Sequence, residues 1–252
     1  MNADNEKQLR LSLSGYALKT IAVAAMIIDH AAYLFCDAAS PLGIVLHFIG
    51  RLTAPIMCYF LAEGYYHTGN FRWYAMRLFV FALISQIPFQ LVINKGVLTF
   101  PPPVLNVLFT LLCGLLALRA WDTIQNESLR RAAVCGLMLL TSFMDWPIFG
   151  VLFIFVFALN RGDRRAQLTA YAWACVGKVA YSLLLVLAGA KDLVTVISAL
   201  GVFCVISLLM LYNGKRGGER TGKLGKQARW LFYIAYPAHL LLLGILYRGY
   251  MG

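Results

Sequence analysis

Long apolar stretches, separated by short charged or Gly- and Pro-containing breaks, occupy almost the whole chain. Most of them approach the roughly 20 residues that a helix needs to cross the hydrocarbon core of a bilayer. Continuous apolar runs of this length are typical of membrane-spanning helices. We therefore predict nine helices, at residues 17–35, 44–66, 73–93, 104–121, 132–144, 148–159, 168–187, 193–212 and 230–247.

The fifth and sixth predicted helices are short and are separated only by Asp145-Trp146-Pro147. Two arrangements fit this break. It is either a tight external turn between two spans, or the tip of a re-entrant hairpin that enters the membrane and leaves on the same side. We expect the external turn.

Composition supports an all-α membrane protein. Of the 252 residues, 61% are hydrophobic and 13% are charged, whereas soluble domains carry about 45–50% apolar and about 25% charged residues. Too few polar groups are available to cover the outside, so the outside must face lipid. Nine spans leave no room for a separate soluble domain, and we predict a single transmembrane helical domain, residues 1–252.

The formal net charge of +11 is explained by topology rather than by nucleic-acid binding. Membrane proteins concentrate Lys and Arg in their short cytoplasmic loops. With the N-terminus in the cytoplasm and the C-terminus external, the nine-helix layout places Lys95, Lys191 and Arg248 outside and seventeen of the 22 basic residues inside. This bias also suits a bacterial cytoplasmic (inner) membrane. The seventeen are Lys7, Arg10, Lys19, Arg72, Arg77, Arg119, Arg130, Arg131, Arg161, Arg164, Arg165, Lys215, Arg216, Arg220, Lys223, Lys226 and Arg229.

The six cysteines are scattered within apolar runs, and no close CxxC pair occurs. This pattern supports neither a zinc site nor a disulfide framework. We expect the cysteines to be small buried hydrophobes and expect no metal site.

Ionisable side chains inside the predicted spans are the first candidates for function. They are Asp29, His30, Arg51, Glu63 and Lys178. A charged group in hydrocarbon costs at least ~2.5–3.5 kcal/mol, so such residues are rare and mark functional sites. Lys178 has the alternative of extending its amine toward the interface.

Helix geometry places the polar residues of four helices at similar depth. At about 1.5 Å per residue, His30 and Arg51 lie roughly 8–12 Å below the external surface. Polar residues share a helix face at i, i+4 spacing, and one common polar cavity would satisfy them together. The pairs with this spacing are His47 with Arg51, Gln86 with Gln90, and Asn106 with Thr110. The alternative is that these polar residues only hold helices together. We favour this alternative for Gln86, Asn106 and Thr110.

Other polar residues have simpler explanations. Glu63 and His67 share a face near the inner boundary, where an interfacial pair is expected. His47 and His239, taken alone, are more typical of hydrogen-bonded core residues than of catalytic ones.

A series of short motifs runs in order along most of the chain. They are Leu18-Lys19-Thr20-Ile21-Ala22, Met26-Ile27-Ile28-Asp29-His30, Arg51-Leu52-Thr53-Ala54-Pro55-Ile56, Phe60-Leu61-Ala62-Glu63-Gly64, His67-Thr68, Arg77-Leu78-Phe79, Ser85-Gln86-Ile87-Pro88-Phe89, Asn106-Val107-Leu108-Phe109-Thr110 and Tyr236-Pro237-Ala238-His239-Leu240. Through these motifs the chain resembles the TraX family, named for the conjugation protein that acetylates pilin. The resemblance is weakest between residues 121 and 226.

This resemblance implies a membrane-bound acyltransferase that takes an acetyl group from cytoplasmic acetyl-CoA. His30 would be the base or acyl relay, Asp29 would orient it, and Arg51 would serve the donor or a developing oxyanion. The acceptor would be a pilin-like N-terminus or another amine at or beyond the outer face, and an O-acylated cell-surface glycan is the alternative. The candidates for substrate binding are Glu63, His67, Gln86, Asn106, Thr110 and His239.

The chemistry leaves two points open. Neighbouring helical positions diverge by about 100°, so Asp29 could pair with Arg51 rather than with His30, and we expect the Arg51 pairing. The basic loops permit an electrostatic path for the phosphates of CoA, but no phosphate-binding glycine loop is visible. A small proton-coupled transporter using Asp29, His30, Arg51 and Glu63 as a relay, or a purely structural membrane subunit, would also place these residues in spans.

Overall fold

The computed structural model describes residues 12–215, 217 and 224–251, and in this part of the chain it contains helices and no strand. Short 3-10 turns at Thr141–Phe143 and Leu200–Phe203 join some of the helices. The α-helices are α2 (Gly15–Phe35), α3 (Pro41–Gly50), α4 (Thr53–His67), α5 (Phe71–Ile93), α6 (Val107–Thr123), α7 (Glu127–Leu140), α8 (Phe149–Leu159), α9 (Arg164–Leu187), α10 (Leu193–Ala199), α11 (Cys204–Met210) and α12 (Leu224–Met251).

The predicted all-α class is confirmed, and each of the nine predicted segments overlaps a helix. Two of the segments are interrupted: residues 44–66 by the break between α3 and α4, and residues 193–212 by the turn between α10 and α11. Among the described residues, five helical segments are long and apolar enough to cross a membrane. They are Gly15–Phe35, Pro41–His67, Phe71–Ile93, Arg164–Leu187 and Leu193–Met210.

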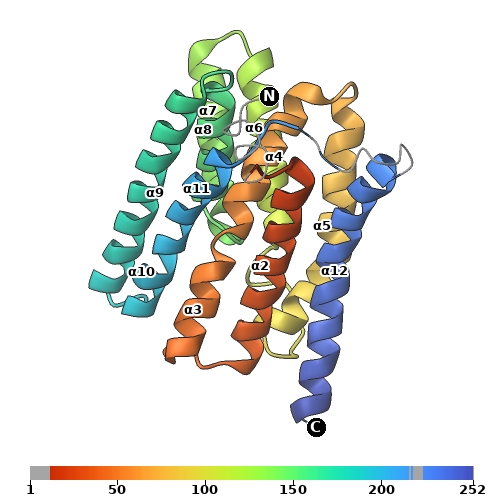
Figure 1. Ribbon diagram of the computed structural model, residues 1–252, viewed down its shortest axis with the longest axis vertical. Helices are drawn as coiled ribbons and strands as arrows, with labels where there is room; N and C mark the ends of the chain where they lie inside the picture. The colour runs from red at the N-terminus through yellow and green to blue at the C-terminus, as the bar shows by residue number, and fades with distance from the viewer. Residues whose placement is uncertain (1–11, 216, 218–223, 252) are drawn as a thin grey trace, which may run out of the picture.

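The helices run up and down, so that their connections gather at two ends of the bundle (Figure 1). At one end, the backbone N–H of Leu13 donates to Leu211 O at 2.8 Å, and Glu63 pairs with Arg161 at 3.4 Å. We call this the basic end. At the opposite end, Arg248 donates to Gly96 O at 3.1 Å.

This alternation agrees with the predicted placement of the loop charges, while the side of the membrane that each end faces stays a prediction. Lys7, Arg10, Arg216, Arg220 and Lys223, which contribute to the charge pattern, lie outside the described residues.

Side-chain caps begin many of the helices. Ser14, Asn70, Asn126 and Asp163 each accept a hydrogen bond from a backbone N–H in the first turn of the helix that follows. The first backbone donors of a helix have no partner within it, and a side-chain oxygen at the N-cap satisfies one of them. These caps explain where the chain turns between spans.

The core lies where α8 is surrounded by α4, α6 and α9. Val151, Phe153 and Ile154 are fully buried, as expected for a short helix that is apolar on every side. By contrast, Trp173 and Leu187 on α9 are 72% and 75% exposed. An apolar surface of this kind is suited to lipid.

The α7–α8 hairpin is too short to cross the membrane. With 11 residues, α8 is about 16 Å long, roughly half of a ~30 Å hydrocarbon core. Its tip contacts Thr110 and Arg51, and Figure 1 shows the hairpin ending well short of the far ends of α2 and α3. The tip therefore lies inside the bundle, which is the re-entrant alternative and not the external turn that we expected.

Pro55 explains the break between α3 and α4. A proline has no backbone N–H, so the carbonyl four residues earlier, that of Arg51, has no helical donor. The chain tightens there, and the N–H of Leu52 donates to Ile49 O at 3.1 Å. At this break the side chain of Arg51 contacts the ring of Trp146 on the α7–α8 hairpin.

Candidate functional site

Asp29 and His47 form a partly buried pair between α2 and α3. The Nδ1 atom of His47 lies 2.8 Å from Oδ1 of Asp29, and His47 is 8% exposed. Gly50 allows this contact, because a Cβ there would lie 2.3 Å from the Asp29 carboxyl carbon. The glycine lets α2 and α3 approach closely enough for the two side chains to meet.

The partner of His47 determines its tautomer. An ionised carboxylate can only accept hydrogen bonds, so Nδ1 of His47 carries the proton and donates to Asp29. The Nε2 atom is then the acceptor nitrogen. This arrangement matches the carboxylate–imidazole pair that orients a general base in hydrolases.

His30 and His239 form a second pair, between α2 and α12. Nδ1 of His239 lies 2.8 Å from the carbonyl oxygen of Ala235, and its Nε2 lies 3.0 Å from Nδ1 of His30. The carbonyl can only accept, so His239 donates from Nδ1 and, in the neutral form, accepts at Nε2. His30 therefore donates from Nδ1, which leaves its own Nε2 with a lone pair.

Arg51 and Lys178 converge on the indole of Trp146 at the tip of the α7–α8 hairpin. The Arg51 guanidinium lies 5.7 Å and the Lys178 amine 6.0 Å from the ring centroid. Arg51 also interacts electrostatically with both Asp29 and Asp145. Cations over an indole face are stabilised by its quadrupole, so this cluster keeps positive charge beside the two histidine pairs.

A cavity of about 230 Å³ extends from the basic end toward these histidines, between α2, α4, α5, α6 and α12. Its walls are mainly apolar, and its lining includes Met26 and Tyr236. His30 follows Met26 by four residues and His239 follows Tyr236 by three, so each histidine lies on the same helix face, one turn farther from the basic end.

Basic groups line the same cavity toward the basic end. Lys19 lies over the Phe60 ring, 4.7 Å from its centroid, and Arg77 lies over the Tyr233 ring, 5.8 Å from its centroid. The buried Nε of Arg77 has no hydrogen-bond partner. A buried donor without a partner is costly, so this nitrogen is available to an anionic ligand.

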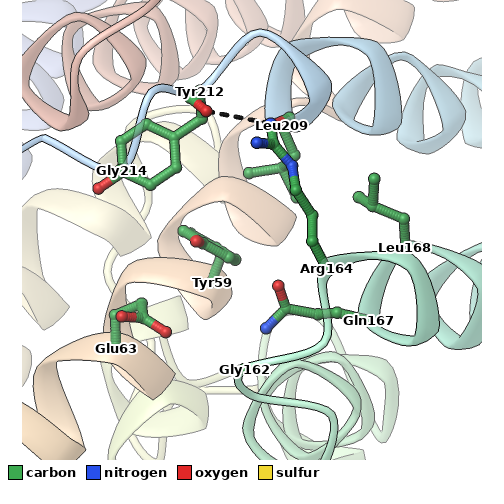
Figure 2. A pocket seen from close by; sticks show the side chains of 9 residues that line it. All are labelled: Tyr59, Glu63, Gly162, Arg164, Gln167, Leu168, Leu209, Tyr212 and Gly214. Carbon is green, nitrogen blue, oxygen red and sulfur yellow. Dashed lines mark hydrogen bonds between the residues drawn. The ribbon is translucent and has the colours of Figure 1, made fainter.

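A second cavity, of about 210 Å³, also lies at the basic end, on the other face of α4 (Figure 2). Figure 2 shows Tyr59, Glu63 and Gln167 around it. Most of its polar groups already have protein partners. Arg164 donates to the carbonyls of Leu209, Met210 and Tyr212, and Gln167 donates to Phe157 O at 2.7 Å.

The structure divides the predicted site residues into separate hydrogen-bonded groups instead of one shared polar network. Gln86 accepts from the Asn106 side chain at 2.8 Å, and Asn106 also donates to Ala82 O. Thr110 donates to the carbonyl of Asp145. These contacts tie α5, α6 and the hairpin tip together, in agreement with the helix-holding interpretation.

Glu63 and His67 lie at the basic end, away from this centre. Glu63 lies 3.6 Å from His67, which is the interfacial pairing expected from their spacing. It also lies 3.4 Å from Arg161, a contact that the sequence did not predict. His67 also lines the larger cavity, and Glu63 lines the smaller one.

The expected Asp29–Arg51 pair is not the contact that forms, because Asp29 is hydrogen-bonded to His47. Sequence reasoning placed His47 on one face with Arg51 but left it out of the site. The signal that could have found it was this i, i+4 spacing next to a charged intramembrane residue. The Lys19 and Arg77 lining of the cavity was also missed, because both residues are typical loop charges.

The fold and the site define a multi-pass helical membrane protein with a carboxylate–histidine pair and a histidine–histidine pair beside an intramembrane arginine. A family model described as TraX protein matches residues 14–247. A probable fimbrial assembly protein FimC, serogroup H1, from Dichelobacter nodosus is 34% identical over 238 residues, which cover 92% of this chain and 95% of the relative. The chain belongs to the TraX family. No solved structure matches it.

Proposed function

We propose that this protein is a membrane-bound acetyltransferase that takes its acetyl group from acetyl-CoA at the basic end. The group is transferred to an acceptor amine at or beyond the opposite face of a bacterial cytoplasmic membrane. Family membership supports this reading, since the family takes its name from a protein of pilin acetylation. The name of the fimbrial relative is consistent with a pilin-like N-terminus as the acceptor.

The observation that carries the proposal is the cavity that leads from Lys19 and Arg77 toward His30. CoA has a phosphorylated head and a long, narrow, largely uncharged arm that ends in the thioester. Charge-assisted hydrogen bonds from Arg and Lys suit the phosphates, and the mainly apolar walls suit the arm. The thioester would then arrive next to the His30–His239 pair.

His30 is suited to the role of acyl relay. Its Nδ1–H is engaged with His239, so its Nε2 lone pair can attack the thioester carbonyl. Arg51 would stabilise the oxyanion that develops during attack. Transfer to a hydroxyl group, such as that of a glycan, would need the same catalytic groups as transfer to an amine. The class of acceptor is therefore left to the experiment below.

The test is transfer of label from [¹⁴C]acetyl-CoA by purified protein in lipid vesicles. The acceptor is a synthetic peptide with a free N-terminal amine followed by an apolar helix. We expect labelled peptide with the wild type, a loss of about 100-fold or more in His30→Ala, and no labelling of the same peptide with a blocked N-terminus.

Tyr171→Phe is the matched control, because it removes a buried hydrogen bond to Val202 O that lies outside the site. An acetylation rate in His30→Ala equal to that of this control would contradict the assignment of His30. A wild-type protein that labels neither the peptide nor a glycan acceptor, and does not bind CoA, would refute the acetyltransferase proposal.

A further inference from the structure

We propose that His47, held by Asp29, is the base that removes the proton from the acceptor, while His30 serves the donor. This inference rests on the proposed acetyltransferase function and divides its chemistry between two imidazoles. The inference is drawn from the hydrogen-bond partner of each imidazole, which is Asp29 for His47 and His239 for His30.

A base must carry a positive charge once it has taken a proton. Behind His47 lies the Asp29 carboxylate, 2.8 Å from Nδ1, which stabilises an imidazolium. Next to His30 lies His239, whose Nε2 in the neutral form accepts a hydrogen bond from Nδ1–H of His30. A neutral imidazole stabilises a neighbouring cation less than a carboxylate does. His47 is therefore the better base, and His30, which is neutral before the reaction and has a lone pair on Nε2, is the nucleophile.

The charged groups around His47 support its assignment as the base. Asp29 interacts electrostatically with Arg51, His30 and His47. Asp145 and Lys178, which interact with Arg51, complete the group from the hairpin tip and from α9. Asp29 is the carboxylate hydrogen-bonded to His47, and Arg51 follows His47 by one helical turn on the same face. His47, the proposed base, and Arg51, the cation proposed to stabilise the oxyanion, therefore lie on the same face.

The reaction balances in two steps. In the first, Nε2 of His30 forms a bond to the acetyl carbon, the carbon–sulfur bond breaks, and the CoA thiolate leaves, so that the His30 ring becomes a positively charged acetylimidazolium. In the second, the acceptor nitrogen bonds to the acetyl carbon while Nε2 of His47 takes its proton. The bond from the acetyl carbon to His30 breaks, its electron pair restores the neutral imidazole, and His47 then releases its proton to water.

The two steps are separated by two assays on full-length protein in vesicles. Exchange of labelled CoA into acetyl-CoA reports the first step, and labelling of the amine-bearing peptide reports both. We expect His47→Gln to keep exchange within about twofold and to lose peptide labelling by about 100-fold or more, the usual range for a general base. His30→Ala should lose both activities, and Tyr171→Phe should keep both.

A second readout separates catalysis from folding. Hydroxylamine is a small nucleophile that is largely unprotonated at neutral pH, so its capture of the acetyl group depends less on a protein base. We expect His47→Gln to acetylate hydroxylamine at close to the wild-type rate, after subtraction of the rate in empty vesicles. We expect Asp29→Asn to behave in the same way, with a smaller loss of peptide labelling.

Peptide labelling by His47→Gln at the wild-type rate would overturn the inference and leave the acetyltransferase proposal intact. Parallel loss of exchange, hydroxylamine capture and peptide labelling would also overturn it, since that pattern means a structural role. A wild-type protein without any transfer would instead overturn the proposed function, and the inference with it.

Discussion

Behind the imidazole of His47 lies a carboxylate, and behind that of His30 lies a second imidazole. Both rings lie inside a membrane domain, where the second partner of a histidine fixes its tautomer and so decides which nitrogen can react. The Asp29 carboxylate and the Ala235 carbonyl oxygen can only accept hydrogen bonds, so the hydrogen bonds in the Asp29–His47 and His30–His239 pairs each run in one direction. The difference between the two histidines therefore comes from their neighbours and not from their own chemistry.

At the residue scale, substitution of Arg77 tests whether acetyl-CoA binds in the cavity that Lys19 and Arg77 line. If its unpartnered Nε binds a CoA phosphate, Arg77→Leu should raise the KM for acetyl-CoA by about 10-fold or more, because a hydrogen bond to a charged group contributes ~1.5–3 kcal/mol. The value of kcat should change little. Steady-state acetylation of the amine-bearing peptide at varied acetyl-CoA measures both constants.

Arg130→Leu is the control for Arg77. Arg130 also has a buried, unpartnered Nε and lies over the Trp121 ring, but it does not line the cavity. Equal increases in KM for the two variants would mean that general positive charge at the basic end attracts CoA, and that Arg77 has no specific role.

At the scale of elements, the site depends on how closely α2 and α3 approach. Gly50 faces Asp29, and Gly201 of the turn between α10 and α11 would place a Cβ 2.2 Å from Phe48 O and 3.1 Å from the Arg51 Cβ. Small residues at helix contacts let backbones approach in membranes. The break between α3 and α4, which Pro55 causes, adds a second constraint, because it ends α3 at Gly50, the residue before Arg51.

Gly50→Ala tests this close approach. The added methyl group would overlap the Asp29 carboxylate, so we expect α2 and α3 to separate, the Asp29–His47 contact to be lost, and stability to fall by about 1–3 kcal/mol. Acetylation of the peptide should fall with it. Thermal unfolding in detergent and the labelling assay measure the two effects.

Gly136→Ala is the matched control on α7, where nothing lies within 4 Å of the new Cβ. Alanine favours helix over glycine by about 1 kcal/mol, so this variant should be as stable as the wild type or more so. A Gly50→Ala protein that unfolds at the wild-type temperature with full activity would show that the close approach is not required.

At the scale of the whole molecule, the two ends differ in charge. The basic end holds Arg72, Arg119, Arg130, Arg131, Arg161, Arg164 and Arg165, at the helix ends and connections that lie there. At the other end, Lys95 and Arg248 lie next to Gly96. The positive-inside rule predicts that the basic end faces the cytoplasm. In the proposed function, this orientation would open the cavity lined by Lys19 and Arg77 to the compartment that contains acetyl-CoA.

Labelling of introduced cysteines tests the orientation. In a variant without the six native cysteines, Lys95→Cys and Lys191→Cys should react with a membrane-impermeant maleimide in intact cells. Arg131→Cys and Arg165→Cys should react only after permeabilisation. The reverse pattern would invert the topology, and with it the direction of acetyl transfer.

The sequence by itself determined the helical class, the nine apolar segments and the alternation of basic loops. Each of these depends on hydropathy or charge within one stretch of chain, which tertiary contacts do not change. It also pointed to Asp29, His30 and Arg51, because an ionisable residue in an apolar run stands out without any knowledge of its neighbours.

Only the tertiary structure decided which residues are partners. His30 meets His239 across 209 residues of chain, and Asp29 meets His47 instead of Arg51. Each residue step turns a helix face by about 100°, so a partner depends on the rotation and separation of two packed helices. Those are set by contacts such as the one at Gly50. The cavity between five helices, and the hairpin tip that stops inside the bundle, follow from the same packing.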